Sequence, residues 1–186
     1  MQLVILDRDG VINEDSADYI KSPEEWIPIP GSLEAIARLH HAGWHVVVAT
    51  NQSGIARKLF DPDILMRIHE KMHRSISDAG GQIEAIFFCP HGPNDNCSCR
   101  KPRPGLFLDI AHRLRISLHG VPTIGDSLHD LQASQAAGAN PILVRTGKGN
   151  GTLIAHSSSI DVPVYDNLAT AVDDLLAIRY RDNSNV

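Results

Sequence analysis

Residues 3–10 read LVILDRDG, and this stretch decides how the rest of the chain is interpreted. Four consecutive apolar residues, with β-branched side chains among them, are typical of a strand that is covered on both faces. Asp7 and Asp9 follow at once, and Gly10 allows a sharp turn that would face both carboxylates inwards. A turn with solvated carboxylates is the alternative that this motif alone leaves open. The stretch therefore predicts a buried strand that ends in a concentrated negative site, suited to Mg²⁺ and to a nucleophilic carboxylate.

Further apolar runs alternate with stretches of helical period along the chain. The other expected strands are 45–49, 83–88, 121–124 and 141–144, and the expected helices are 33–39, 61–80, 104–114, 128–137 and 168–178. Such alternation predicts an α/β fold: a doubly wound, three-layer sandwich with a central parallel sheet. We expect one domain over residues 1–180, with a disordered tail at 181–186. Residues 15–30 are too few for a large cap domain.

Composition excludes some classes of protein. The chain has 186 residues, of which 42% are hydrophobic and 21% charged, and its formal net charge is -5. An acidic chain without a basic stripe argues against nucleic-acid binding, although a metal and a few cations could still hold a phosphorylated substrate. The first apolar run is too short for a signal peptide or a membrane span. We therefore expect a cytoplasmic protein that binds neither membranes nor nucleic acids. We also expect it to be a monomer.

Polar residues also follow the other expected strands, where the working loops of parallel sheets lie. Residues 50–54 offer a hydroxyl and N–H groups that could hold phosphate oxygens, although the same string is an ordinary strand end. Residues 100–105 place three cations among prolines, which suits either a rigid phosphate clamp or a solvated basic loop. Asp126 stands at a strand tip, and Asp130 follows in the first turn of a helix, where an acid is favourable in any case.

All three cysteines fall within eleven positions. Cys89 and His91 are followed closely by Cys97 and Cys99. Three thiols and one imidazole form a complete tetrahedral zinc set, with no position left for a catalytic water. Unrelated cysteines are the alternative. The cluster predicts a structural Zn²⁺ in a loop at 89–99, which ends directly before Arg100 and stiffens the basic loop.

Taken in order, the four strand ends resemble the haloacid dehalogenase (HAD) superfamily of phosphatases, whose fold is Rossmannoid. The pattern is D-x-D-G, a strand-end Thr, a Lys before a helix and G-D-x-x-x-D, and it covers residues 3 to about 145. The resemblance implies that Asp7 attacks phosphorus and forms an aspartyl-phosphate. Asp9 would protonate the leaving alkoxide and then activate water.

The same resemblance implies roles for the remaining motif residues. Thr50 and Lys101 would contact the phosphoryl oxygens. Mg²⁺ would be held by Asp7, Asp126 and the backbone carbonyl of Asp9, with Asp130 orienting this set.

The cysteine cluster resembles a zinc-containing branch of the superfamily, which holds heptose-bisphosphate and histidinol-phosphate phosphatases. The strings at 7–13, 19–26 and 50–57 are similar to the heptose members. This implies loss of the 7-phosphate from D-glycero-D-manno-heptose 1,7-bisphosphate, a step of nucleotide-activated heptose synthesis for bacterial surface polysaccharide (lipopolysaccharide). The implied substrate contacts are Asp15, Ser16, Ala17, Asp18, Asn51, Gln52, Ser53, Arg100, Lys101 and Ser127. The heptose branch often has Lys where this chain has Ser127, which weakens the case for contacts to a second phosphate.

Two alternatives differ from this interpretation. A histidinol-phosphate phosphatase would need acids around the substrate amine, whereas the basic residues near Arg100 favour a bisphosphate. A non-catalytic zinc-binding interaction module would have no need to keep Asp7, Asp9, Lys101 and Asp126. A nucleotide-binding Rossmann domain is set aside, because the loop after the first strand lacks G-x-G-x-x-G.

Overall fold

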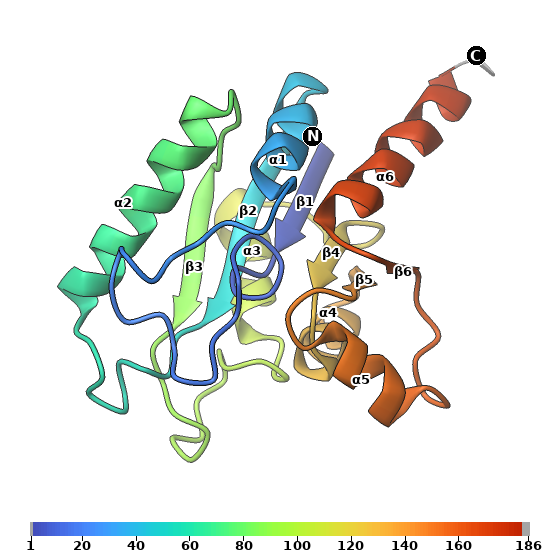
Figure 1. The fold of residues 1–186 in the computed structure, drawn as a ribbon. Helices are drawn as coiled ribbons and strands as arrows, with labels where there is room; N and C mark the ends of the chain where they lie inside the picture. Colours follow the sequence, from blue (N-terminus) through green and yellow to red (C-terminus); the bar gives the residue numbers. More distant parts are fainter. Residues whose placement is uncertain (1, 184–186) are drawn as a thin grey trace.

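Six parallel strands form one sheet, in the order β3-β2-β1-β4-β5-β6 (Figure 1). The computed structural model describes residues 2–183. The strands are β1 Gln2–Leu6, β2 Trp44–Asn51, β3 Ala85–Cys89, β4 Pro122–Gly125, β5 Asn140–Val144 and β6 Val164–Tyr165. Each strand after the first is reached through a helix or a long loop, as parallel pairing requires. The parallel sheet predicted from the sequence is confirmed.

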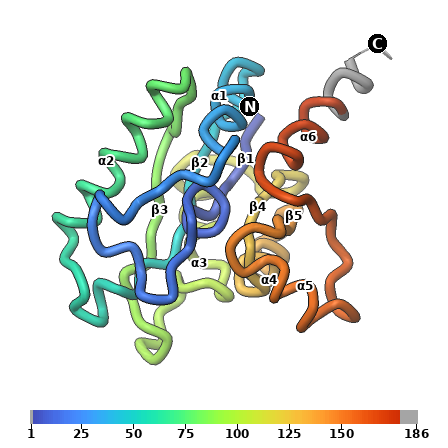
Figure 2. The backbone as a smooth tube through the Cα atoms, in the orientation of Figure 1, coloured from blue at the N-terminus to red at the C-terminus, as the bar shows by residue number. Residues whose placement is uncertain are grey.

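Helices cover both faces of the sheet, as Figures 1 and 2 show. α1, α2 and α6 pack on one face, and α3 and α4 on the other. The helices are α1 Ser32–His41, α2 Pro62–Asp78, α3 Gly105–Leu114, α4 Leu128–Ala136, α5 Gly149–His156 and α6 Leu168–Asn183. The expected three-layer sandwich is therefore the observed architecture.

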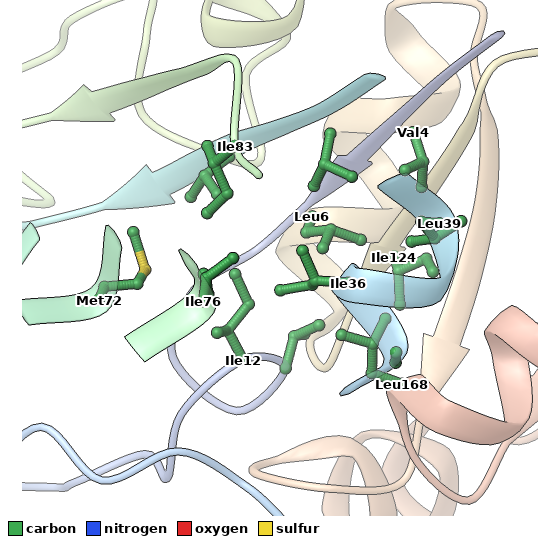
Figure 3. Packing of buried hydrophobic residues seen from close by; sticks show 14 of the residues in the cluster. Val4, Leu6, Ile12, Ile36, Leu39, Met72, Ile76, Ile83, Ile124 and Leu168 are labelled. Carbon is green, nitrogen blue, oxygen red and sulfur yellow. The ribbon is translucent and has the colours of Figure 1, made fainter. Parts of the chain in front are cut away.

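Alternation along β1 divides the core into two layers. Val4 and Leu6 pack with Ile36 of α1 in one buried cluster, shown in Figure 3. Leu3 and Ile5, which point the other way, join the cluster under α3 and α4. Successive side chains of a strand face opposite sides, so a strand with four apolar residues in a row must be covered twice.

Two elements differ from the sequence prediction. β6, of two residues, and α5, a helix with almost no apolar stripe, lie in a region that the pattern left unassigned.

The tail at 181–186, predicted to be disordered, is described only in part. α6 continues to Asn183, so residues 181–183 are helical, while 184–186 lie outside the described residues.

The side on which successive strands join the sheet changes at β1. From β1 the sheet grows through β2 and β3 to one side, and β4 then pairs with the other side of β1. Ligands of open α/β sheets bind beyond the carboxyl ends of the strands at such a switch point. Asp7 follows β1 there, and its backbone N–H donates to Ile124 of β4 at 2.9 Å. Among residues 2–183, no helix combines the length and apolarity that crossing a membrane would need.

Candidate active site

A pocket of about 340 Å³ opens at the carboxyl edge of the sheet. It brings together loops that follow β1, β2, β3, β4 and β5. Its wall is formed by Asp7, Asp9, Asp15, Ser16, Ala17, Tyr19, Ile20, Thr50, Asn51, Gln52, Ser53, Arg100, Lys101, Asp126, Ser127, His129, Asp130 and Lys148. Residues far apart in the sequence thus meet where the parallel-strand rule places them.

Lys101 is the buried cation at the centre of the pocket, with 3% of its surface exposed. Its ammonium lies 3.0 Å from Oδ1 of Asp7 and 2.5 Å from Oδ1 of Asp130, and it donates to the carbonyl of Ala49 at 2.8 Å. Burial alone would lower the pKa of Lys101, but the charges of Asp130 and Asp7 outweigh it and raise the pKa. The side chain is therefore a permanent positive charge beside Asp7.

Negative charge in the pocket is not fully compensated. Asp7, Asp126 and Asp130 have carboxylate oxygens within 4.8 Å of one another. Burial, and then the neighbouring Asp130, raise the pKa of Asp7 to about 7 against the pull of Lys101. Burial, Asp130 and Asp7 raise the pKa of Asp126 to about 8. A bound cation that prefers hard oxygen ligands would stabilise these carboxylates in their ionised form. The three carboxylates therefore fit a site for Mg²⁺.

The loop after β1 is folded tightly against this carboxylate set. Gly10 has φ +81°, and a Cβ there would collide with the carboxylate of Asp126. Only glycine allows this backbone shape and this approach.

The carboxylate of Asp9 lies outside that set and is held by a separate network. Arg8, fully buried, forks over it at 2.9–3.1 Å, Asn13 donates to it at 2.9 Å and Gln52 at 3.0 Å. Burial by itself raises the pKa of Asp9, but the charge of Arg8 and the three donors outweigh it and lower the pKa. With its side chain held by these donors, Asp9 has its backbone carbonyl left for a metal, and the ligand role that the resemblance implies for it stays a prediction.

The residues after β2 chiefly position their neighbours. The Asn51 side chain donates to the carbonyl of Lys101 and accepts from its N–H, both at 3.1 Å. Gln52 donates to Thr50 Oγ1 at 2.9 Å as well as to Asp9. The threonine hydroxyl hydrogen has no acceptor in that pair, which leaves it free to donate to a phosphoryl oxygen. All three residues and Ser53 line the pocket, and their contacts to substrate stay predictions.

The loop after Asn13 supplies one rim of the pocket. Asp15, Ser16 and Ala17 line it, as the resemblance implies, but Asp18 does not. Asp18 is exposed, and its carbonyl accepts from Lys21 at 2.9 Å, so its part in the loop is conformational. Tyr19, with φ +66°, turns the chain back towards the pocket. Tyr19 and Ile20 are wall residues that the sequence prediction missed.

Ser127 is the N-cap of α4. Its hydroxyl accepts from the N–H of Asp130 and donates to Oδ2 of Asp130 at 2.5 Å, while the Ser127 N–H donates to the same carboxylate at 3.0 Å. This reciprocal arrangement is a capping box. It holds Asp130 towards Lys101, in keeping with the orienting role implied for Asp130. A small hydroxyl at position 127 therefore has a structural function in this chain.

Lys148 and His129 are further wall residues that no motif pointed to. The backbone N–H of Lys148 donates to Oδ2 of Asp126 at 2.8 Å, and its ammonium lies 2.9 Å from Asp15. His129 lies in the first turn of α4, at a variable position of the G-D-x-x-x-D string, and Lys148 lies in the loop after β5, outside any recognised string.

The cysteine cluster forms a second candidate metal site. Cys89 ends β3, buried, and His91, Cys97 and Cys99 surround its sulfur. Their Sγ and Nδ1 atoms are separated by 3.2–3.7 Å in the four measured pairs. A tetrahedral zinc with bonds of 2.0–2.3 Å would space its ligands by roughly 3.5–3.8 Å. The donor set and its spacing therefore fit Zn²⁺.

That loop is continuous with the active site. Gly105 at the start of α3 donates its N–H to Ser98 at 3.1 Å, and a Cβ there would collide with the Ser98 carbonyl. Arg100 donates to the carbonyl of His91 at 3.3 Å. The cysteine cluster is thus packed onto the segment that carries Lys101.

Comparisons with known proteins agree with this geometry. The HAD-hydrolase-like family model matches residues 98–171, and the model described as polynucleotide kinase 3 phosphatase matches residues 3–127. A Bordetella bronchiseptica protein named D-glycero-beta-D-manno-heptose-1,7-bisphosphate 7-phosphatase is 56% identical, over 95% of this chain and 98% of its own. A Pseudomonas aeruginosa protein of the same name is 49% identical, over 94% and 97%.

A solved structure is similar throughout. The crystal structure of D,D-heptose 1,7-bisphosphate phosphatase from B. bronchiseptica, complexed with magnesium and phosphate, has a TM-score of 0.93 and 55% identity. It covers 95% of this chain and 99% of that one. High identity over nearly full length, together with the strand-end carboxylates and Lys101, places the chain plainly: it belongs to the HAD-like family of heptose-bisphosphate phosphatases.

Proposed function

We propose that the chain removes the 7-phosphate of D-glycero-β-D-manno-heptose 1,7-bisphosphate through an aspartyl-phosphate on Asp7. One observation carries the proposal: buried Lys101 bridges Asp7 and Asp130, beside Asp126, at the switch point of a parallel sheet. The relatives' names supply the substrate and its anomer. They also favour this enzyme over the histidinol-phosphate phosphatase, and an active phosphatase over a non-catalytic zinc module.

In the first step an oxygen of Asp7 attacks phosphorus, and the bond from phosphorus to the C7 oxygen breaks. Lys101 neutralises the attacking carboxylate and then the phosphoryl oxygens, where a fixed charge in a buried site is worth most. Asp9 gives its proton to the leaving alkoxide. The hydrogen bonds from Arg8 favour the ionised form of Asp9. The negative charge of the bound phosphate must therefore raise the pKa of Asp9 enough for it to carry a proton before the first step.

In the second step water attacks the phosphorus of the aspartyl-phosphate, and the bond to Asp7 breaks. Asp9 takes the water's proton, because its lowered pKa keeps it ionised after the first step and its donors fix its orientation. Inorganic phosphate leaves, Asp7 is again a free carboxylate, and Asp9 again carries the proton that it gave to the leaving alkoxide. Mg²⁺ held by Asp7, Asp126 and the Asp9 carbonyl would supply charge neutralisation of the phosphoryl oxygens.

The proposal extends to the zinc loop and the setting of the enzyme. Zn²⁺ on Cys89, His91, Cys97 and Cys99 would be structural, because four protein ligands leave no open position. It would hold the segment that carries Arg100 and Lys101. We also propose a single domain over residues 1–180 that acts as a monomer in the cytoplasm.

Side-by-side kinetics test the substrate. With Mg²⁺ present, kcat/KM should be far higher for the heptose bisphosphate than for histidinol phosphate, and a higher value for histidinol phosphate would overturn the substrate. The Asp7→Asn variant tests the mechanism. It should fold, as checked by circular dichroism, because the environment already disfavours charge on Asp7. Phosphate release should be abolished, and normal turnover would refute the nucleophile.

A further inference from the structure

Lys148 reaches the rim of the pocket from the loop between β5 and α5, and its side chain has no part in the mechanism above. It shares the pocket wall with Asp7 and Asp126. Its ammonium lies 2.9 Å from Oδ2 of Asp15, yet 68% of its side chain is exposed. A cation in this position can meet a ligand that enters from solvent.

The backbone of this loop is built onto the metal-binding carboxylates. The N–H of Lys148 donates to Asp126 at 2.8 Å, and Thr146 Oγ1 donates to the carbonyl of Gly10 at 2.6 Å. Gly147 has φ +56°, and a Cβ there would collide with both Asp126 and Gly10. The fold therefore fixes where position 148 lies without using its side chain, so that side chain is free for another role.

The pocket needs a cation at its rim if it takes a second phosphate. Lys101 is committed to Asp7 and Asp130 beside the reacting phosphate. Ser127, where the related branch often has Lys, is uncharged and engaged in the cap of α4. Besides Lys101, the pocket wall over residues 2–183 contains two Lys or Arg residues, Arg100 and Lys148.

We propose that Lys148 binds the phosphate that is not cleaved, the 1-phosphate, and so sets the preference for a bisphosphate. The inference rests on the proposed function. Lysine suits the role as a mobile point charge on a flexible stem. The lysine side of its pair with Asp15 is open to solvent, with 68% of the Lys148 side chain exposed against 19% of Asp15, so an entering phosphate dianion can exchange for the carboxylate. The carboxylate of Asp15 is then available to accept hydrogen bonds from sugar hydroxyls.

Steady-state kinetics on two substrates test this assignment. Lys148→Met keeps the aliphatic stem and the backbone contact to Asp126, and removes only the charge. On heptose 1,7-bisphosphate, KM should rise about tenfold or more with kcat within about twofold, as for loss of an interaction made equally in ground and transition states. On heptose 7-phosphate, kcat and KM should each stay within about twofold. Lys148→Arg should keep most of the preference for the bisphosphate.

Arg113→Ala is the matched control, since it removes an exposed cation in the last turn of α3, outside the pocket wall. It should leave both substrates unaffected. Equal losses on both substrates in Lys148→Met would overturn the inference, because Lys148 would then act on the reacting phosphate or on the metal site. An unchanged preference in that variant would overturn it too. A wild-type enzyme without any preference for the bisphosphate would instead refute the proposed function, and the inference with it.

Discussion

The ammonium of Lys101 lies 3.0 Å from Oδ1 of Asp7, with almost none of its own side chain exposed. An ion pair in this setting has two effects. It keeps the carboxylate of Asp7 available as an anion against the cost of burial, and it supplies positive charge where phosphoryl oxygens must arrive. Electrostatic stabilisation by preorganised charges in an active site that excludes water is usually the largest single contribution to catalysis.

Replacing that charge tests both effects. In Lys101→Met, kcat on the heptose bisphosphate should fall by about 10²–10³-fold, as for loss of one transition-state donor. Thermal unfolding without added Mg²⁺ should also occur at lower temperature, because Asp7 and Asp130 are left buried without their cation. Arg113→Ala, which removes an exposed cation, should show neither effect. A kcat within tenfold of wild type would contradict the role given to Lys101.

Gln52 should act on proton transfer through Asp9. Gln52→Leu removes one of the donors that orient the Asp9 carboxylate. We expect kcat to fall about tenfold or more on the sugar phosphate, which needs a general acid for its poor leaving group. The loss on p-nitrophenyl phosphate should be much smaller, because that leaving group needs little protonation. Gln135→Leu, at an exposed site on α4, is the control. Equal losses on both substrates would contradict a role in proton transfer.

The site divides into what the sequence reveals and what it does not. Asp7 and Asp126 each end an apolar run, and parallel strands bring such ends together, so their meeting follows from pattern alone. Cys97 and Cys99 are visible by spacing. Lys148 was missed because its place depends on packing between Gly147 and Gly10, which are 137 positions apart in the sequence and carry no periodic signal.

Other misses have local causes. β6 has only two residues, too few for any alternation to show. Asp18 was grouped with Asp15 by adjacency, but the loop turns it outwards before Tyr19. The cap formed by Ser127 could have been found, because Ser followed by Asp three residues later marks a helix start. The sequence interpretation instead considered only the charge at position 127, because the related branch often has Lys there.

The capping box of α4 should make a measurable contribution to the stability of the protein. Ser127→Ala removes the hydroxyl that bonds Asp130 in both directions, while leaving the Ser127 N–H in place. The free energy of unfolding should fall by about 1 kcal/mol, the usual cost of losing a serine N-cap. Urea unfolding followed by circular dichroism measures it. Ser158→Ala, at an exposed site after α5, should change the midpoint little. An unchanged midpoint in Ser127→Ala would mean that the cap is not stabilising.

His69 should make the protein sensitive to mild acid. Burial, and then the charge of Arg8, lower the pKa of its imidazole to about 3. Since Arg8 can only donate, the Nε2 atom 3.3 Å from its Nη1 must accept. The unfolded chain binds a proton near pH 6.5, well above the folded pKa. The stabilising effect of neutral His69 is therefore complete above about pH 6.5 and is lost as pH falls towards 3.

The matched variant isolates this effect from other titrations. His69→Gln keeps an acceptor for Arg8 but does not titrate. The difference in unfolding free energy between wild type and His69→Gln should shift against wild type as pH falls from about 6.5 to 4. His112→Gln, at an exposed position on α3, should show no such trend. A difference that is independent of pH would refute the buried, neutral state of His69.

Zinc should be needed for stability more directly than for chemistry. Cys97→Ser removes one of four ligands, and metal analysis should fall from about one zinc per chain to well below one. The melting temperature should drop, because the four ligands come together only in the folded chain, so zinc binding contributes to the folding free energy. The loop holds Arg100 through the carbonyl of His91, so KM for the heptose bisphosphate should rise as well. Asn94→Ala, exposed in the same loop, should keep its zinc and its melting temperature. Wild-type protein purified without chelators that contains no zinc would contradict the site, whatever the variants do.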